Sequence, residues 1–255
     1  MATITRARGA ERRRGVLEDL MQTGMIVLAG GIGKRIGRPV PKQLLLLGGK
    51  PLIVHVLEKV QDLPDVAEVV ITCPASHLEE TRELVVNHGF DVDRFRCIEG
   101  GVTRQESVQR GLDELDGAES VIIHEAVRPL VTADEFRALL DAPDANAMYG
   151  IPIPFTVLKG HEYVEDLLER SELVNVQLPQ KFDAVALRGA HAAAVRDGAR
   201  FTEDASLFYH YTGARVRILA GSERNLKITV PTDLIIAEAI YADLVGRTPD
   251  QLGRD

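Results

Sequence analysis

Short apolar runs alternate along this chain with segments whose apolar residues recur at helical spacing. The apolar runs predict strands at residues 25–29, 68–73, 95–98, 120–124 and 147–153. The segments between them predict helices at residues 52–60, 77–88, 104–115 and 133–140. This order of strand and helix predicts an α/β fold with a mostly parallel sheet and helices on both faces.

The alternation fails between residues 152 and 180, a segment with three prolines and two short β-like runs. We interpret it as a projecting β-arm, whose apolar residues would need a partner subunit to cover them. Beyond it, helices are predicted at residues 182–195, 203–211 and 231–244, with Thr202 as the N-cap of the second. Strands are predicted at residues 216–220 and 225–229. The arm predicts a homodimer.

These elements are expected to form one domain over residues 25–246, with residues 152–180 as its dimerisation arm. Residues 1–24 are rich in arginine and are expected to be a flexible tail, and residues 247–255 a second one. No secretory signal is expected, because the first 24 residues lack an apolar stretch.

The first predicted strand leads into a loop that combines glycines with cations. Gly30, Gly31 and Gly33 follow the strand, and Lys34, Arg35 and Lys42 come shortly after. Glycines let a backbone pass close to a ligand, and successive amides form a nest for anions. The cations indicate that this anion is a phosphate.

Two familiar phosphate-binding patterns do not match this loop. The dinucleotide fingerprint needs a third glycine where Ile36 stands, and an acid after the second strand, which ends in Thr72, Cys73 and Pro74. The Walker pattern needs Lys and then Ser or Thr after the glycines, and it is absent. A nicotinamide enzyme and a P-loop NTPase are therefore both disfavoured.

Composition narrows the range of partners. The net charge of −8 argues against a nucleic-acid partner, so positive charge must be concentrated at the site. No apolar run approaches the roughly 20 residues of a membrane span, so no membrane association is expected. Two cysteines make no disulfide framework and predict a cytoplasmic protein.

Chemically informative residues follow three of the predicted strands, at residues 31–35, 101–107 and 125–128. The carboxyl ends of parallel strands meet at one edge of a sheet, where such folds bind ligands. We therefore expect these three loops to converge on one site.

Six motifs in order carry a family resemblance over residues 25–244, after the loop LAGGIGKRIG at residues 28–37. They are PKQ (41–43), GGVTRQESV (100–108), HEAVRP (124–129), ERS (169–171), TEDAS (202–206) and NLKIT (225–229). The chain resembles the cytidylyltransferases that act on 2-C-methyl-D-erythritol 4-phosphate and on ribitol 5-phosphate. The resemblance implies a Rossmann-like fold of the nucleotide-diphospho-sugar transferase type. It also implies transfer of CMP from CTP to a polyol phosphate, with Mg²⁺ as cofactor and pyrophosphate as the second product.

The resemblance also implies roles for individual residues. The catalytic residues would be Arg35, Lys42 and Lys227. The acceptor would be bound by Glu125, which also serves as metal ligand, and by Arg128, Thr156 and Arg170. CTP would be bound by Ala29, Gly30, Gly31, Gly33, Lys34, Gly101, Arg104 and Ser107. His124 is expected to be a core histidine at a strand end and not a general base.

Most departures from the family pattern lie on the acceptor side. Glu125 and Phe155 stand where the methylerythritol enzymes have aspartate, Leu178 replaces a threonine, and Glu203–Asp204 inverts the usual order of the two acids. The methylerythritol phosphate is the leading acceptor, ribitol 5-phosphate or a related polyol phosphate is the alternative, and a non-catalytic CTP-binding protein is an alternative of another class.

Overall fold

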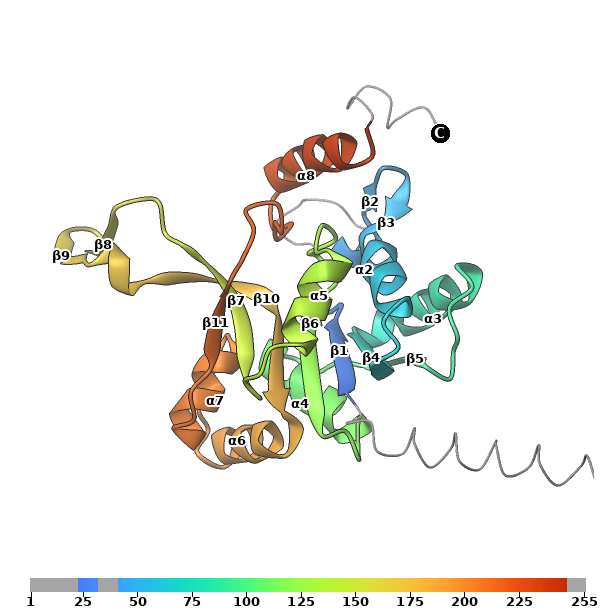
Figure 1. Cartoon of the computed structure of the whole chain (residues 1–255), viewed down its shortest axis with the longest axis horizontal. Coiled ribbons are helices and arrows are strands. Elements are labelled where there is room, and N and C mark those ends of the chain that lie inside the picture. The colour runs from blue at the N-terminus through green and yellow to red at the C-terminus, as the bar shows by residue number, and fades with distance from the viewer. Residues whose placement is uncertain (1–22, 32–40, 247–255) are drawn as a thin grey trace, which may run out of the picture.

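Seven strands form the central sheet in the order β11-β7-β10-β6-β1-β4-β5. The computed structural model describes residues 23–31 and 41–246. Within them the sheet consists of β1 (Thr23–Leu28), β4 (Val66–Cys73), β5 (Phe95–Glu99), β6 (Ser120–Glu125), β7 (Ala147–Pro152), β10 (Val174–Asp183) and β11 (Arg217–Ala220). All neighbours run parallel except β10, which is antiparallel to both β6 and β7. The expected mostly parallel sheet is confirmed (Figure 1).

The register of β1 brings the expected strand ends together. Leu28, the last residue of β1, lies opposite Thr72 of β4 on one side and Glu125 of β6 on the other. Both partners run parallel to β1, so the carboxyl ends of three strands and the loops that follow them share one edge of the sheet.

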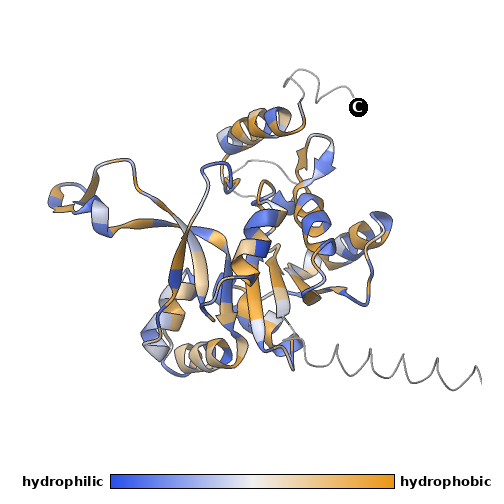
Figure 2. Ribbon diagram, in the orientation of Figure 1, coloured by the Kyte–Doolittle hydropathy of each residue, from blue (hydrophilic) through white to orange (hydrophobic). Residues whose placement is uncertain are grey.

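Helices cover both faces of the sheet, as predicted. One face packs against α2 (Leu52–Gln61), α3 (Leu78–Asn87) and α5 (Ala133–Leu140). The other packs against α4 (Arg104–Glu114), α6 (Ala184–Arg196) and α7 (Asp204–Thr212). Because side chains alternate along a strand, Met25 and Val27 enter the first layer while Ile26 and Leu28 enter the second. In Figure 2 the strands at the centre are predominantly hydrophobic.

A small third cluster joins the last helix to the start of the chain. α8 (Pro231–Leu244) packs on the short hairpin of β2 (Leu46–Leu47) and β3 (Lys50–Pro51), which follows the one-turn helix η1 (Lys42–Leu44). Leu47, Leu52, Ile228 and Ala237 are fully buried there. This packing fixes the segment before α8 beside η1. No helix of the described residues is both long enough and apolar enough to cross a membrane.

Residues 157–168 form a separate two-stranded antiparallel sheet of β8 (Val157–Gly160) and β9 (Val164–Leu168). This hairpin extends away from the central sheet (Figure 1). Phe155, Tyr163, Val164 and Leu167 are exposed on it or next to it. The expected end of the arm at residue 180 is wrong, because residues 174–180 belong to β10 and pair with β7 and β6. The one-turn helices η2 (Ala75–His77) and η3 (Arg170–Glu172) complete the elements.

Besides shifts of one or two residues at the ends of other elements, four further features differ from the sequence prediction. Phe182 lies in a strand and does not begin a helix, since β10 continues to Asp183, which caps α6. Glu203, not Thr202, caps α7 by accepting from the amides of Ala205 and Ser206. Residues 225–229 form no strand. Thr23 and Gly24 begin β1, and the rest of the predicted tails at residues 1–24 and 247–255 lies outside the described residues.

Candidate active site

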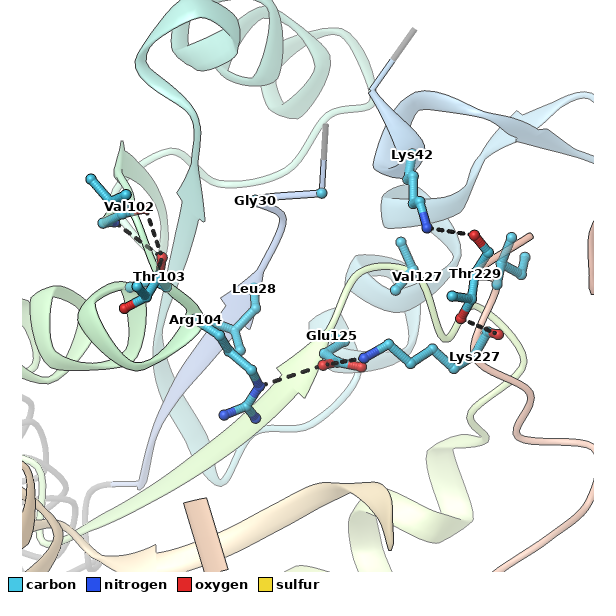
Figure 3. Close-up of a pocket in the computed structure, with 14 residues that line it drawn as sticks. Leu28, Gly30, Lys42, Val102, Thr103, Arg104, Glu125, Val127, Lys227 and Thr229 are labelled. Carbon is cyan, nitrogen blue, oxygen red and sulfur yellow. Dashed lines mark hydrogen bonds and ion pairs between the residues drawn. The ribbon is translucent and has the colours of Figure 1, made fainter. Parts of the chain in front are cut away.

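A cavity of about 440 Å³ opens where β1 and β6 end. Its walls come from the end of β1 and the glycines after it, from η1, from the start of α4, from the end of β6 and from the segment before α8 (Figure 3). Of the residues predicted to bind ligands, six line it, together with the predicted catalytic Lys42 and Lys227: they are Gly30, Gly31, Gly101, Arg104, Ser107 and Glu125. The predicted convergence of the three loops is therefore confirmed for the residues that the structure describes.

Glu125 lies at the centre of this site and is held by three cations. The Nζ of Lys227 donates to Oε1 at 2.9 Å. The Nε of Arg104 lies 3.5 Å from Oε1, and the Nε of Arg128 lies 3.4 Å from Oε2. Glu125 and Arg128 are buried, whereas the side chain of Lys227 is 44% exposed. Lys227 is therefore the cation of the three that can most easily reach a ligand or solvent.

These cations determine the charge of Glu125. Burial acts to raise the pKa of Glu125, but Lys227, Arg104 and Arg128 outweigh it and hold the pKa below its usual range. The carboxylate is therefore ionised at neutral pH. Burial is also the largest influence on Arg128 and lowers the pKa of its guanidinium, with Glu125 opposing.

Arg104 is held from its other end by Asp204. Thr103 caps α4, which places Arg104 at the first position of the helix. Its Nη1 lies 2.6 Å from Oδ2 of Asp204, the first residue of α7. Asp204 also lies 3.4 Å from Nε2 of the fully buried His191. Burial acts to raise the pKa of Asp204, and Arg104 with His191 reverses this, so that the pKa is lowered.

Lys227 and Lys42 are brought to the cavity by backbone hydrogen bonds. The amide of Ile228 donates to Val127 after β6 at 2.9 Å, which fixes the segment that carries Lys227. The Nζ of Lys42 donates to the carbonyl of Thr229 at 2.7 Å, and the Lys42 amide donates to Gly31 at 3.1 Å. The glycine loop, η1 and the segment before α8 thus meet around Lys42.

Asn225 connects Arg128 with the layers behind the site. Its carbonyl accepts from Nη1 of Arg128 at 3.0 Å, and its Nδ2 donates to the carbonyl of Leu178 at 2.7 Å. Arg128 does not line the cavity and reaches it only through Glu125. His124 is fully buried against Phe136, and burial lowers its pKa to about 3, so it is a neutral core histidine as expected.

The glycine and serine at the start of α4 have a packing reason. A Cβ on Gly101 would collide with Glu106, so a larger residue would push the loop off the helix. The hydroxyl of Ser107 accepts from the Gly101 amide at 3.0 Å and donates to the Thr103 carbonyl at 2.9 Å. The loop is therefore preformed at the mouth of the cavity.

The remaining predicted residues fall elsewhere. Ala29 is buried next to the cavity without lining it. Thr156 and Arg170 are exposed beside the hairpin and do not line the cavity, and Arg170 donates to the carbonyl of Pro154 at 3.1 Å. Gly33, Lys34 and Arg35 lie outside the described residues.

Several residues of the site received no role from the sequence. Thr103, Val127 and Thr229 line the cavity, and Asp204 holds Arg104 from behind. Asp204 lies in the TEDAS motif and Thr229 in NLKIT, so the motifs marked the segments. Nothing in the spacing indicated which member of each motif faces the site.

The donor set fits a magnesium ion only if a ligand supplies most of the oxygens. Within residues 23–31 and 41–246, no three His, Cys, Asp or Glu side chains gather as a metal-ligand set. Glu125 nevertheless has a buried oxygen, Oε2, that accepts no hydrogen bond in the described part of the chain, although Nε of Arg128 lies 3.4 Å from it. One carboxylate together with phosphate oxygens is a set that Mg²⁺ takes. Glu125 therefore fits a Mg²⁺ ion that arrives with a phosphate ligand.

A mostly parallel α/β sheet with a glycine loop and cations beyond its carboxyl edge defines a nucleotide-binding fold of the nucleotidyltransferase type. The chain belongs to the 2-C-methyl-D-erythritol 4-phosphate cytidylyltransferase (IspD) family, whose model matches residues 23–243.

Similar proteins agree with this assignment. The chain is 38% identical to a 2-C-methyl-D-erythritol 4-phosphate cytidylyltransferase of Geobacter metallireducens, over 86% of the chain and 97% of that protein. It is 37% identical to the bifunctional enzyme IspD/IspF of Clavibacter michiganensis, over 89% of the chain but only 56% of that longer protein. The crystal structure of the Thermus thermophilus cytidylyltransferase superposes with a TM-score of 0.68 at 29% identity, over 85% of the chain and 97% of that structure.

Proposed function

We propose that this protein transfers CMP from CTP to 2-C-methyl-D-erythritol 4-phosphate. An oxygen of the acceptor phosphate attacks the α-phosphorus of CTP, and the bond from that phosphorus to the bridging oxygen of the β-phosphate breaks. The products are 4-diphosphocytidyl-2-C-methyl-D-erythritol and pyrophosphate. The observation that carries the proposal is the cationic cavity beside the glycine loop, in a chain of this family.

The chemistry explains why cations dominate the site. The attacking phosphate oxygen is already an anion, so the reaction needs no general base. The barrier comes from bringing two polyanions together and from the charge that develops around the α-phosphorus, which positioning and electrostatics lower. His124 is buried and neutral, and it takes no part.

We assign the CTP side to the glycine loop, η1 and the start of α4. The amides of residues 29–31 and of Gly33, with Lys34, would hold the triphosphate, and Arg35 and Lys42 would stabilise the α-phosphate under attack. Gly101, Arg104 and Ser107 would bind the cytosine and ribose. In support, Lys42 reaches the cavity next to Gly31, while Arg104 and Ser107 line the opposite wall.

We assign the acceptor side to Glu125 and Lys227, with Arg128 acting through Glu125 and with Thr156 and Arg170 from the arm of a second subunit. Lys227 is half exposed beside Glu125 and can turn toward a phosphate without leaving the cavity wall. The exposed Phe155, Tyr163 and Leu167 support a homodimer, because a partner would cover their apolar surface. Mg²⁺ would be held by Glu125 together with phosphate oxygens, and would supply charge neutralisation there.

The protein is expected to act in the cytoplasm. Cys73 and Cys97 are both free and buried in the core, which suits a reducing compartment. Burial also raises the pKa of the Cys97 thiol to about 12, so it is chemically inert.

Pyrophosphate release measured with each combination of donor and acceptor tests the proposal. We expect release with CTP, Mg²⁺ and 2-C-methyl-D-erythritol 4-phosphate, and none with ATP, GTP or UTP at matched concentrations. Faster release with ribitol 5-phosphate would move the assignment to that acceptor. Tight CTP binding without release with either acceptor would show a non-catalytic CTP-binding protein.

A further inference from the structure

Asp204 is a buried acid that neither lines the cavity nor contacts it, yet it makes the shortest ion pair of the site. It is 1% exposed, and its Oδ2 lies 2.6 Å from Nη1 of Arg104. Arg104 does line the cavity. A charge buried this deeply is costly unless its partner is well fixed, so the pair sets the position of the guanidinium.

The guanidinium of Arg104 contacts two carboxylates, which are carried by acidic side chains of different length. Asp204 takes its Nη1 at 2.6 Å, whereas Glu125 lies 3.5 Å from its Nε. Figure 3 shows the Arg104 guanidinium beyond its contact with Glu125, with both terminal nitrogens pointing away from that carboxylate. A guanidinium has five N–H donors in a fixed plane, so two contacts fix its plane and leave donors for a ligand.

Asp204 itself is held firmly. It is the first residue of α7, which Glu203 caps, and Glu203 also accepts from Nε2 of Gln180 in β10 at 2.6 Å. His191 of α6 lies 3.4 Å from its other oxygen. The start of a helix also favours a negative charge. The position of Asp204 therefore depends on the sheet and on two helices, none of which the ligand needs to move.

We propose that Asp204 is a positioning residue that holds Arg104 over the cavity and away from Glu125. The side-chain lengths of Asp204 and Glu125 are also matched, so that lengthening one of these acids must be compensated by shortening the other to keep the Arg104 guanidinium in place. The proposal rests on the proposed function, because Arg104 is taken to bind CTP. Without Asp204, Arg104 closes on Glu125 and loses its CTP-binding orientation, and Glu125 is less available to Lys227. Exchanging the two acids keeps both charges and the combined reach, since each change moves a carboxylate by about one C–C bond, ~1.5 Å.

The first test is Asp204→Asn, with Glu203→Gln as the matched control on the same helix. Asparagine keeps the shape of the side chain and removes the charge that holds Arg104. We expect the KM for CTP and the Kd for CTP to rise about 10- to 100-fold with kcat within about threefold, because ground-state and transition-state binding fall together. Glu203→Gln weakens the cap of α7 but keeps a side-chain oxygen that can accept there, so Asp204 stays in place, and we expect a lower Tm with a KM within about twofold of the wild type.

The second test is a double-mutant cycle with Glu125→Asp, Asp204→Glu and both together. We expect each single change to lower kcat/KM. We expect the kcat/KM of the double variant to be at least tenfold higher than the value obtained by multiplying the two single losses. The same double-mutant cycle, measured on the midpoints of unfolding, reports the coupling of the two acids through Arg104 and needs no enzymatic activity. It also decides the matter if Asp204→Asn fails to fold.

Three results separate the possible failures. If the wild type does not bind CTP, the proposed function fails, and the unfolding cycle still tests the matched lengths. If the wild type turns over and Asp204→Asn keeps its KM, the positioning role is wrong. If the two single losses simply multiply in both cycles, the lengths are not matched and the second half of the proposal is overturned.

Discussion

Replacing Glu125 with glutamine removes the one negative charge that three cations share. Glutamine has nearly the same shape, so the change tests charge and not packing. In the protein without ligand, Lys227, Arg104 and Arg128 each lie within 3.5 Å of a Glu125 oxygen, and the glutamine leaves them gathered there with no carboxylate between them. We expect Glu125→Gln to destabilise the folded protein.

The size of the destabilisation depends on which of the three cations can pair with another carboxylate or reach solvent. Removing one member of a buried ion pair costs about 3–5 kcal/mol. Arg104 keeps Asp204, and Lys227 can turn to solvent, but Arg128 is buried and has no other carboxylate within ion-pair distance among the described residues. We therefore expect the lower end, about 3 kcal/mol, which corresponds to a Tm lower by about 6–12 °C for a domain of this size.

Thermal unfolding of the protein without ligand, with Glu58→Gln as the matched control, measures this effect. The exposed pair of Lys50 and Glu58 is shorter, at 2.7 Å, than any contact of Glu125. Exposed pairs contribute about 1 kcal/mol or less, and salt screens them. We expect a small, salt-dependent change for Glu58→Gln and a large, salt-independent one for Glu125→Gln. A Tm for Glu125→Gln within 2 °C of the control, about the shift of a surface substitution, would refute the reasoning.

Three further predictions concern catalysis, acid stability and assembly. Lys42→Ala should lower kcat about 10²–10³-fold, as loss of one transition-state donor does, and a near-normal rate in the pyrophosphate assay would remove Lys42 from the mechanism. The folded pKa values of Glu125 and Asp204 are lowered, so their stabilisation is present above the unfolded values of about 4 and is lost as the pH falls through the folded ones. Denaturant titrations should show a shallower acid loss for Glu125→Gln than for the wild type, and equal slopes would contradict this. If the proposed homodimer forms through the exposed hairpin, Tyr163→Asp should lower the sedimenting mass from that of a dimer to that of a monomer, whereas an unchanged mass would contradict a contact at Tyr163.

The local hydrophobic pattern was sufficient to predict most of the fold, because a strand that is buried on both faces is a short and continuous apolar run. The apolar runs at β1, β4 and β6 are short and continuous, as in a sheet covered on both sides. The bounds of α5 and α8 agree with the prediction to the residue. Where two residues could both cap a helix, as with Thr202 and Glu203, the sequence could not decide, because the backbone angles at that turn come from packing.

The wrong strand at residues 225–229 is instructive. Its alternation has a structural basis, since Leu226 and Ile228 pack in the cluster with α8 while the side chain of Lys227 reaches Glu125, although Ile228 also lines the cavity. Among the described residues, one backbone–backbone hydrogen bond joins this segment to the residues after β6, from the Ile228 amide to Val127, and no ladder forms. Period-two patterning reports which side each residue faces, but it does not report whether a partner strand is present.

The charges explain why a protein with a net charge of −8 can hold a phosphate ligand. Arg104, Arg128 and Lys227 come from three separate segments, and Glu125 and Asp204 are the acids in ion pairs with them among the described residues. Three cations therefore share two carboxylates in this part of the site, inside a molecule with a net charge of −8. The acids keep three mutually repelling cations in place before the ligand arrives, and the local positive charge then attracts phosphate. No local motif could show this balance, because Arg104 and Asp204 are one hundred residues apart in the chain and meet only through the packing of α4, α6 and α7.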